Sequence, residues 1–174
     1  DDNSDLFYLK YKVKNYVLCV GRIENRKNQL MLAFALKGTG IPSVFMGTES
    51  NKEYSELLRK HADQNVIITG YIEHESALWF SAFANALVFC LPSWAEGAPI
   101  SALEAHALGL PLILSNRSGE YEYFGDEAIY CDPLDPLSIR KAVEMIYLDK
   151  YKKNKNYMNT LMYTWKNHLE DTVS

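Results

Sequence analysis

The sequence lacks the features that mark several large classes of protein. Its 174 residues contain no apolar run as long as a transmembrane helix, and the polar start from Asp1 to Asp5 is not a signal peptide. No block of basic residues occurs and the net charge is −4, which argues against a nucleic-acid partner. The three cysteines, Cys19, Cys90 and Cys131, have the spacing of neither a disulfide framework nor a metal site. We therefore expect a protein of a reduced, cytoplasmic compartment that binds neither nucleic acid nor a metal.

Three common catalytic motifs are also missing. There is no Walker lysine motif and no G-x-G-x-x-G, so a P-loop ATPase and a dinucleotide-binding fold are poorly supported. Ser93 does not lie in a G-x-S-x-G elbow, which argues against a hydrolase nucleophile. The four histidines are scattered without ligand or triad spacing, and we expect structural or exposed roles for them: His61, His74, His106 and His168.

What the sequence does contain is a regular alternation of short apolar runs and helical patterns. Its length and its hydrophobic content of 48% fit one domain with a full core. Strands are predicted over 16–20, 42–46, 66–69, 86–91, 111–114 and 128–131. Helices are predicted over 30–36, with Asn28 as the cap, and over 51–63, 75–83, 100–108 and 136–148. This alternation predicts an α/β fold in which a parallel sheet is covered by helices on both faces.

The two ends differ from this alternating core. Residues 1–15 are polar with interspersed aromatics, and we expect a linker or a loosely docked strand there. Residues 151–174 begin with lysines and continue as a helical pattern that carries Leu161, Met162 and Trp165. The chain starts without Met, which suggests a piece of a longer protein.

In open parallel sheets, ligands bind beyond the carboxyl ends of the strands. The loops expected at that edge are Gly21-Arg22, Gly47-Thr48, Gly70-Tyr71, 93–99 and Ser115-Asn116. Glycine lets the backbone approach a ligand closely, but turns between strands and helices use glycine in any case. For Gly47 and Gly70 we expect only the ordinary turn.

Two cations follow the first predicted strand. Arg22 could clamp a diphosphate with two hydrogen bonds, and Lys27 could add a point charge at the start of the next helix. Arg26 lies in the same loop, however, and surface loops are commonly basic. From these residues alone, a diphosphate site and an ordinary basic loop are equally supported.

Two carboxylates eight positions apart flank the start of the helix predicted from residue 100. Pro99 fits the first helical position, and Glu104 in the second turn leans back toward Glu96. The free N–H groups of the helix start add positive charge between the two acids. An exposed acid on a solvated helix face is the alternative, but the residues around Glu104 are apolar, and a sugar diol would supply the donors that its carboxylate needs. Glu120 and Glu122, in a loop near the same edge, are expected to cap or brace a helix start.

With these motifs in place, residues 16–148 resemble the C-terminal half of the retaining GT-B glycosyltransferases of glycosyltransferase family 4, also called group 1. The matching segments are YVLCVGRIENRKNQ, VIITGYI, LPSWAEGAPISALEAHALGLPLI and GDEAIYCDPLDP, in the family's order and spacing. The E-x7-E pattern formed by Glu96 and Glu104 is the family's signature. The resemblance implies that residues 16–150 form a Rossmann-like, doubly wound sheet of about six strands, one half of a GT-B fold. It also implies that this half binds a nucleoside-diphosphate sugar without a metal or other cofactor.

The resemblance further implies a role for each charged residue of the motifs. Arg22 and Lys27, next to Gly21, would bind the diphosphate of the donor. Glu104 would hold the ribose hydroxyls. Glu96 would face the donor sugar near its reacting carbon and act as the catalytic residue.

Main-chain groups would complete the donor site in the same way. The backbone amides of Gly97 and Ala98 would serve the sugar hydroxyls or the phosphate, whereas the adjacent Pro99 has no N–H to give. The main chain around Tyr71 and Ile72 would line the base. The segment YTWKNHLE, residues 163–170, is similar to the C-terminal helix with which the family crosses back to its other domain.

The family's N-terminal, acceptor-binding domain has no counterpart in these 174 residues. We therefore expect the chain to bind a nucleotide sugar weakly and not to transfer it. The whole protein would transfer a hexosyl-type sugar in bacterial surface polysaccharide or glycoconjugate assembly, in the cytoplasm or in peripheral contact with a membrane through the missing half. Two alternatives stay open, namely a non-catalytic nucleotide-binding module of flavodoxin-like architecture and a GT-B nucleotide-sugar epimerase.

Overall fold

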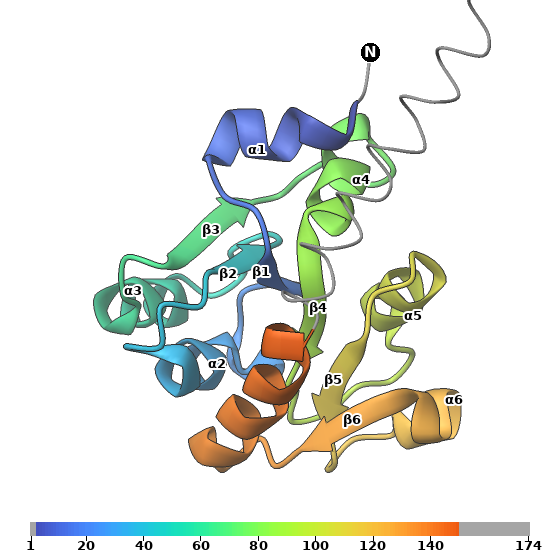
Figure 1. Cartoon of the computed structure of the whole chain (residues 1–174). Coiled ribbons are helices and arrows are strands. Elements are labelled where there is room, and N and C mark those ends of the chain that lie inside the picture. The colour runs from blue at the N-terminus through green and yellow to red at the C-terminus, as the bar shows by residue number, and fades with distance from the viewer. Residues whose placement is uncertain (1–2, 150–174) are drawn as a thin grey trace, which may run out of the picture.

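The computed structural model of the chain describes residues 3–149, and its core is one parallel sheet of six strands (Figure 1). The strands lie in the order β3-β2-β1-β4-β5-β6. Their bounds are β1 (Tyr16–Val20), β2 (Ser43–Met46), β3 (Val66–Gly70), β4 (Ala86–Leu91), β5 (Leu112–Ser115) and β6 (Ala128–Cys131). The predicted α/β fold is therefore confirmed, and the sheet is that of a Rossmann-like domain. The C-terminal segment predicted over 151–174 lies outside the described residues.

The strands form where they do because the sheet is covered on both faces. Every residue of β2, β4 and β5 is buried, and so are the first four residues of β1. Parallel strands covered on both faces need continuous apolar runs rather than alternating ones. The run ALVFCL of β4 is such a sequence, and it lies in the middle of the sheet between β1 and β5.

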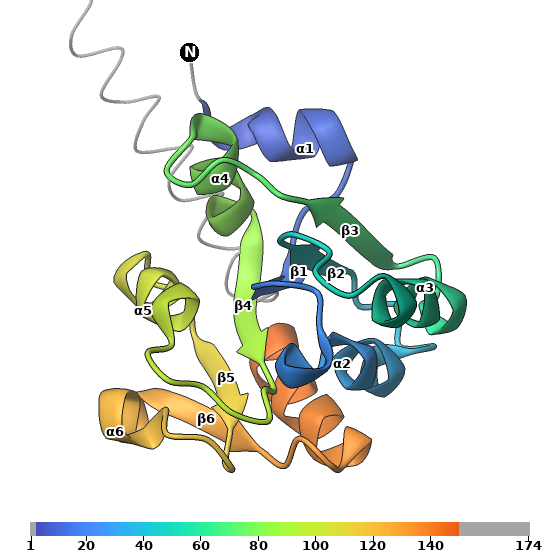
Figure 2. The same ribbon diagram turned by 180° about the vertical axis from the view of Figure 1, so that it is seen from behind.

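The helices divide between the two faces of the sheet. The chain winds from β1 through α2 (Gln29–Leu36) to β2, and through α3 (Lys52–His61) to β3. It then crosses past β1 to β4, so that right-handed connections place α4 (Ala77–Ala84) and α5 (Ile100–Ala107) on the opposite face. Figures 1 and 2 show α2 and α3 side by side, with the final helix over 136–149 next to α2. None of the helices in residues 3–149 is long and apolar enough to cross a membrane.

The strand order reverses between β1 and β4, which are neighbours in the sheet although α2, β2, α3, β3 and α4 separate them in the chain. The loops that leave β1 and β4 therefore diverge from adjacent points of the carboxyl edge. In doubly wound sheets this is the place where ligands bind. One short turn, η2 (Asn25–Lys27), lies in the first of these loops.

The N-terminal segment differs from the expected linker or loosely docked strand. Residues Asn3–Asp5 form a short turn, η1, and α1 (Leu6–Tyr11) is a helix that packs beside α4 (Figures 1 and 2). Phe7 is fully buried, and its backbone N–H donates to Ser81 Oγ over 2.8 Å. A helix this short is not stable by itself, so the packing of α1 against α4 is what holds it.

Asn28 also differs from its predicted role as the cap of α2. It stands at the cap position, but its φ of 61° is left-handed and its side chain makes no cap hydrogen bond. A side-chain cap needs an extended backbone at that position. The amide nitrogen of Asn28 instead donates to the carbonyl oxygens of Pro92 and Pro133, over 2.9 and 3.0 Å. It thereby joins the loops that follow β1, β4 and β6.

Two short helical turns lie between β5 and β6. Here α6 (Tyr121–Phe124) is a single helical turn followed by η3 (Gly125–Glu127). The helix over 136–149 then returns across the sheet, with Ile139 and Val143 fully buried and the hydroxyl of Tyr147 donating to the Asn15 carbonyl over 2.6 Å.

Candidate functional site

A pocket of about 260 Å³ opens at the carboxyl edge of β1, β2 and β3. We call it the carboxyl-edge pocket, and it is lined by Val20, Gly21, Arg22, Met46, Gly47, Thr48, Tyr71, Ile72, His74, Trp79 and Glu104. The residues predicted from the sequence to bind a nucleotide that lie here are Gly21, Arg22, Tyr71, Ile72 and Glu104. They come from two loops and one helix, so the fold brings together residues that are far apart in the chain.

Glu104 projects from α5 to one wall of this pocket. Its side chain is 23% exposed, and its Oε1 lies 2.6 Å from Nε2 of His74. The imidazole of His74 and the Trp79 ring form a T-shaped pair, with 5.0 Å between the ring centroids. The hydrogen bond to Glu104 raises the pKa of His74 above its ordinary value. The structural or exposed role expected for His74 did not include this contact, because nothing in the sequence shows that the loop before α4 faces α5.

Arg22 also lines this pocket, and its side chain is free to reach a ligand. Its side chain is 61% exposed, and among residues 3–149 its one ion pair is a long one, 3.8 Å from NH2 to Glu24 Oε1. Exposed pairs of this kind contribute little to stability, so binding a diphosphate would not need to break a strong contact.

Gly47 allows the main chains at the floor of the pocket to approach each other. A Cβ at Gly47 would overlap the carbonyl oxygen of Gly21 and lie 2.6 Å from its carbonyl carbon. This close approach to Gly21 leaves no room for a side chain, which gives Gly47 a structural role beyond its own turn.

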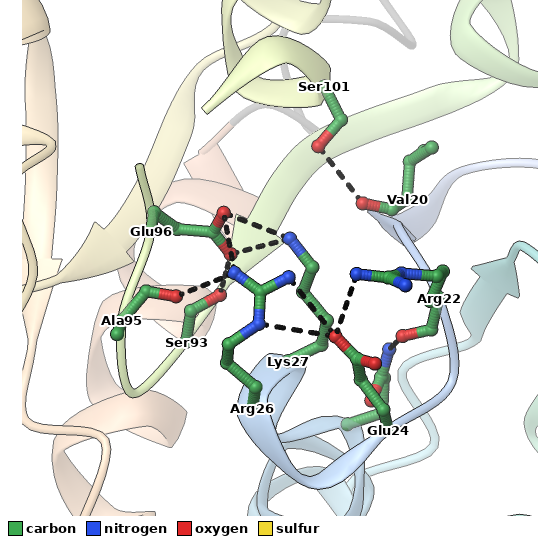
Figure 3. Close-up of polar contacts among 10 residues, drawn as sticks. Val20, Arg22, Glu24, Arg26, Lys27, Ser93, Ala95, Glu96 and Ser101 are labelled. Carbon is green, nitrogen blue, oxygen red and sulfur yellow. Dashed lines mark hydrogen bonds and ion pairs between the residues drawn. The ribbon is translucent and has the colours of Figure 1, made fainter. Parts of the chain in front are cut away.

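Glu96 and Lys27 lie outside this pocket, in a cluster of charges beside it (Figure 3). Lys27 Nζ lies 2.7 Å from Oε1 and 2.9 Å from Oε2 of Glu96, and the hydroxyl of Ser93 donates to Oε1 over 2.6 Å. Arg26 NH1 adds a longer contact, 3.9 Å from Glu96 Oε2. The side chain of Glu96 is only 4% exposed, so it is not a solvated loop acid.

The same cluster continues toward the carboxyl-edge pocket. Arg26 also pairs with Glu24 at 3.1 Å, and Glu24 in turn faces Arg22. Figure 3 shows these side chains in a row from Glu96 through Lys27 and Arg26 to Glu24 and Arg22. We call these five residues the charge cluster; with three cations and two anions, it carries one net positive charge.

Two hydrogen bonds hold the site together at the point where strand order reverses. The N–H of Trp94 donates to the Arg26 carbonyl over 2.9 Å, which ties the loop after β4 to the loop after β1. The hydroxyl of Ser101, in the first turn of α5, donates to the Val20 carbonyl over 3.0 Å (Figure 3). The start of α5 is therefore fixed beside the end of β1.

The loop residues just before α5 stand in two environments. Gly97 and Ala98 are exposed, as a backbone that binds a ligand needs to be, whereas Pro99 is buried. Pro99 takes the cap position of α5 rather than the predicted first helical position, with a φ of −81° and a ψ of 65°. This ψ is not helical, so the helix proper begins at Ile100.

Glu120 does not cap or brace a helix start as expected. It stands before α6, makes no cap hydrogen bond and is fully buried. Neither carboxyl oxygen has a hydrogen-bond partner among the residues the structure describes. Burial raises the pKa of Glu120 to about 7, and the nearby charge of Glu96 acts in the same direction.

Two other features bear on the choice of site. A larger hollow of about 520 Å³ lies between α2 and α3, but its lining is mostly apolar, with Leu30, Met31, Phe34 and Leu57 among its residues. Such a lining offers little to a phosphate or a sugar. Within residues 3–149, no group of three or more His, Cys, Asp or Glu side chains could hold a metal ion.

Comparison with known proteins connects this geometry to a family. Residues 3–160 match the family model described as glycosyl transferases group 1. The chain is 28% identical over 125 residues to protein CapJ of Staphylococcus aureus, which covers 70% of this chain and 31% of CapJ. It is 25% identical over 180 residues to the O-antigen chain mannosyltransferase B of Escherichia coli, covering 95% of this chain and 47% of that protein. The chain thus spans less than half the length of these two relatives.

Among solved structures, the fold is similar to the C-terminal domain of a glycosyl transferase group 1 family protein (LpcC) from Francisella tularensis. The TM-score is 0.66 at 20% sequence identity, and the match covers 83% of this chain and 82% of that domain. At this identity the likeness establishes the fold, and the residues of the site have to be argued from their own geometry.

Proposed function

Since this chain belongs to the glycosyl transferases group 1, we propose that its carboxyl-edge pocket binds the nucleoside-diphosphate sugar donor of a retaining, hexosyl-type glycosyltransferase. The observation that carries the proposal is the position of Arg22 and Glu104 in one pocket at the reversal of strand order. A guanidinium that is free to clamp phosphate and a carboxylate that can accept from a diol are the two groups that a nucleoside diphosphate requires.

The other residues of the site fit the same ligand. Glu104 would accept hydrogen bonds from the ribose hydroxyls, and the main chain around Tyr71 and Ile72 would line the base. Arg22, beside Gly21, would hold the diphosphate. The donor sugar would then extend toward Glu96, past the exposed backbone of Gly97 and Ala98.

The charge cluster would stabilise the charges that develop as the donor bond breaks. As the bond from sugar to diphosphate opens, negative charge builds on the departing phosphate, and Arg22, Lys27 and the start of α5 would stabilise it. The same phosphate would balance the positive character of the sugar on the face where retention requires the new bond to form. Glu96 would contact the sugar hydroxyls near the reacting carbon, its carboxylate oriented by Ser93.

Lys27 can serve the diphosphate only if it leaves Glu96 or contacts both groups together. In the structure its ammonium lies within 2.9 Å of both oxygens of Glu96. An ammonium has three donors, so one of them can turn to a phosphate while the pair with Glu96 is kept. We propose this shared arrangement, because a buried Glu96 without any cation would be costly.

Because the chain spans less than half of its curated relatives, its role in a whole enzyme is also a proposal. We propose that a further, acceptor-binding domain completes the active site, and that the 174 residues alone bind the donor without transferring it. Surface polysaccharide or glycoconjugate assembly is the proposed setting, since one relative acts as an O-antigen chain mannosyltransferase. The proposed location is the cytoplasm, with peripheral membrane contact through the acceptor domain.

A thermal-shift panel tests the donor-binding function. UDP-glucose, GDP-mannose and ADP-glucose are each added to the chain, and one of them is expected to raise Tm. A ligand at about 100 times its dissociation constant adds about 2.7 kcal/mol to the stability of the folded state. The shift should be lost in Glu104→Ala and kept in Glu56→Ala, a matched change of an exposed glutamate on α3. Equal shifts in both variants would indicate binding elsewhere, as in an unrelated nucleotide-binding module.

A further inference from the structure

His74 and Glu104 form a contact inside the proposed donor pocket that the donor itself would have to change. Nε2 of His74 lies 2.6 Å from Oε1 of Glu104, and both residues line the carboxyl-edge pocket. Oε2 of Glu104 has no hydrogen-bond partner among residues 3–149. One oxygen of the carboxylate is therefore engaged by His74, and the other is open to the pocket.

A ribose presents two adjacent hydroxyl groups, and the best partner for such a diol is a carboxylate with both oxygens available. Resting on the donor-binding function proposed above, we propose that His74 occupies the place of one ribose hydroxyl at Glu104, and that donor binding displaces the imidazole and releases its proton. His74 would thus be a positioning residue that holds Glu104 toward the pocket until the donor arrives.

The surroundings of His74 are consistent with displacement. Its side chain is 54% exposed, so the ring can turn toward solvent at little cost once Glu104 is engaged elsewhere. Its contact on the α4 side is the Trp79 ring, which carries no charge. The Glu104 contact is therefore the main interaction that the ring would lose.

The charged groups around His74 determine the direction of proton movement. Glu104 on α5 and the neighbouring Glu75 both raise the pKa of His74 above its ordinary value of about 6.5. Arg22 and Tyr71 are the other titratable groups that line the pocket. When Glu104 turns to the ribose, its hydrogen bond to the imidazole is lost and the pKa of His74 falls. The complex then binds fewer protons than the free chain, so donor affinity rises with pH between the ordinary pKa and the raised one.

Calorimetric titration at about pH 7 measures this proton directly. The chain is titrated with UDP-glucose, GDP-mannose and ADP-glucose in two buffers of different ionisation enthalpy, and the difference in heat gives the protons released. The diphosphate of a nucleotide sugar is esterified at both ends, so it has no group that titrates near neutral pH and contributes no proton itself. The wild-type chain is expected to release a fraction of one proton for each donor bound.

Two variants identify the source of the proton. His74→Gln keeps an N–H donor for Glu104 but does not titrate, and its proton release should be zero. His106→Gln is the matched control, because His106 makes a similar contact with Glu127, 2.8 Å, away from the pocket. His106→Gln should release the same number of protons as the wild type. A second test uses the wild-type chain alone. Its affinity for the donor, measured from pH 6 to pH 8, should rise with pH.

The possible outcomes test the role of His74 separately from donor binding. Donor binding that depends on Glu104 but shows no proton release, or shows proton uptake, would overturn the role of His74 and leave the proposed function standing. Equal proton release in the wild type and His74→Gln would overturn it as well. If none of the three nucleotide sugars binds, the proposed function fails and this inference fails with it.

Discussion

Lys27 and Glu96 form a nearly buried ion pair between the loops that follow β1 and β4. The ammonium lies 2.7 and 2.9 Å from the two carboxylate oxygens, and the side chains are 12% and 4% exposed. Because both charges are largely withdrawn from water, each is stabilised mainly by the other. The pair therefore ties the two loops of the proposed donor site together before any ligand is bound.

Removing one partner of this pair should destabilise the chain, because it leaves the other charge buried without a partner. Lys27→Met leaves the Glu96 carboxylate buried with only Ser93 and a distant Arg26, and we expect the free energy of unfolding to fall by about 3 kcal/mol. Urea denaturation measures the loss. The double variant of Lys27→Met with Glu96→Gln should lose less than the sum of the two single changes.

The control for this prediction is an exposed pair of the same kind. Lys14 pairs with Asp5, and the two side chains are 39% and 53% exposed. Lys14→Met should cost less than about 1 kcal/mol. If Lys14→Met and Lys27→Met lower the stability equally, burial does not strengthen the pair with Glu96.

The sheet could be predicted from the sequence because its strands are short apolar runs between turn residues. All six strands, the four helices α2 to α5 and the helix over 136–149 begin and end within two residues of their predicted bounds, whereas the single turn α6 was not predicted. Covered parallel strands carry a local signal, since every position of β4 or β5 has to be apolar whatever its partner is. The α1 helix carried no such signal, because its stability comes from its packing on α4.

The site could be predicted only in part, because several of its contacts join distant loops. The spacing of Glu96 and Glu104 on a loop and a helix was visible in the sequence, whereas the pairing of Glu96 with Lys27 and of Glu104 with His74 was not. The left-handed backbone of Asn28 likewise depends on the two loops that its side chain joins. Such pairings are set by how the loops meet at the reversal of strand order.

Arg22 is expected to matter for donor binding but not for stability. Its side chain is 61% exposed, and a charge-assisted hydrogen bond to phosphate contributes about 1.5–3 kcal/mol. Arg22→Ala should therefore weaken the binding of a nucleotide sugar at least about tenfold, as measured by calorimetric titration, with Tm unchanged. Arg59→Ala is the control, because Arg59 pairs with Glu49 outside the pocket. Equal weakening by the two changes would argue against Arg22 as the phosphate ligand.

Gly47 should tolerate no side chain, because its Cβ would overlap the carbonyl group of Gly21. We expect Gly47→Ala to lower the free energy of unfolding by about 1–3 kcal/mol, since one of the two main chains has to move. The movement would also shift Arg22, so donor affinity should fall in the same variant. Gly97→Ala is the matched change in open space, with no atom within 4 Å of the added carbon, and its stability should stay within about 0.5 kcal/mol of the wild type. An unchanged stability of Gly47→Ala would show that the two loops adjust freely.

The buried carboxyl of Glu120 should make the stability of the chain depend on pH in an unusual direction. Burial raises its pKa to about 7, from the ordinary value of 4.5. Between these values the folded chain holds a proton that the unfolded chain has lost, so its contribution to stability is complete at low pH and is lost as the pH rises through about 7. Most paired carboxylates act in the opposite direction, because folding lowers their pKa.

Glu120→Gln keeps the shape of the neutral acid and removes the ionisation. Its free energy of unfolding should equal that of the wild type below about pH 4.5 and exceed it at pH 8 by on the order of 3 kcal/mol, as measured by urea denaturation at the two pH values. Glu122→Gln, two residues along and exposed, should show no such gain. A wild type that is as stable as Glu120→Gln at pH 8 would mean that Glu120 ionises without cost, and hence that water or a cation reaches its carboxylate.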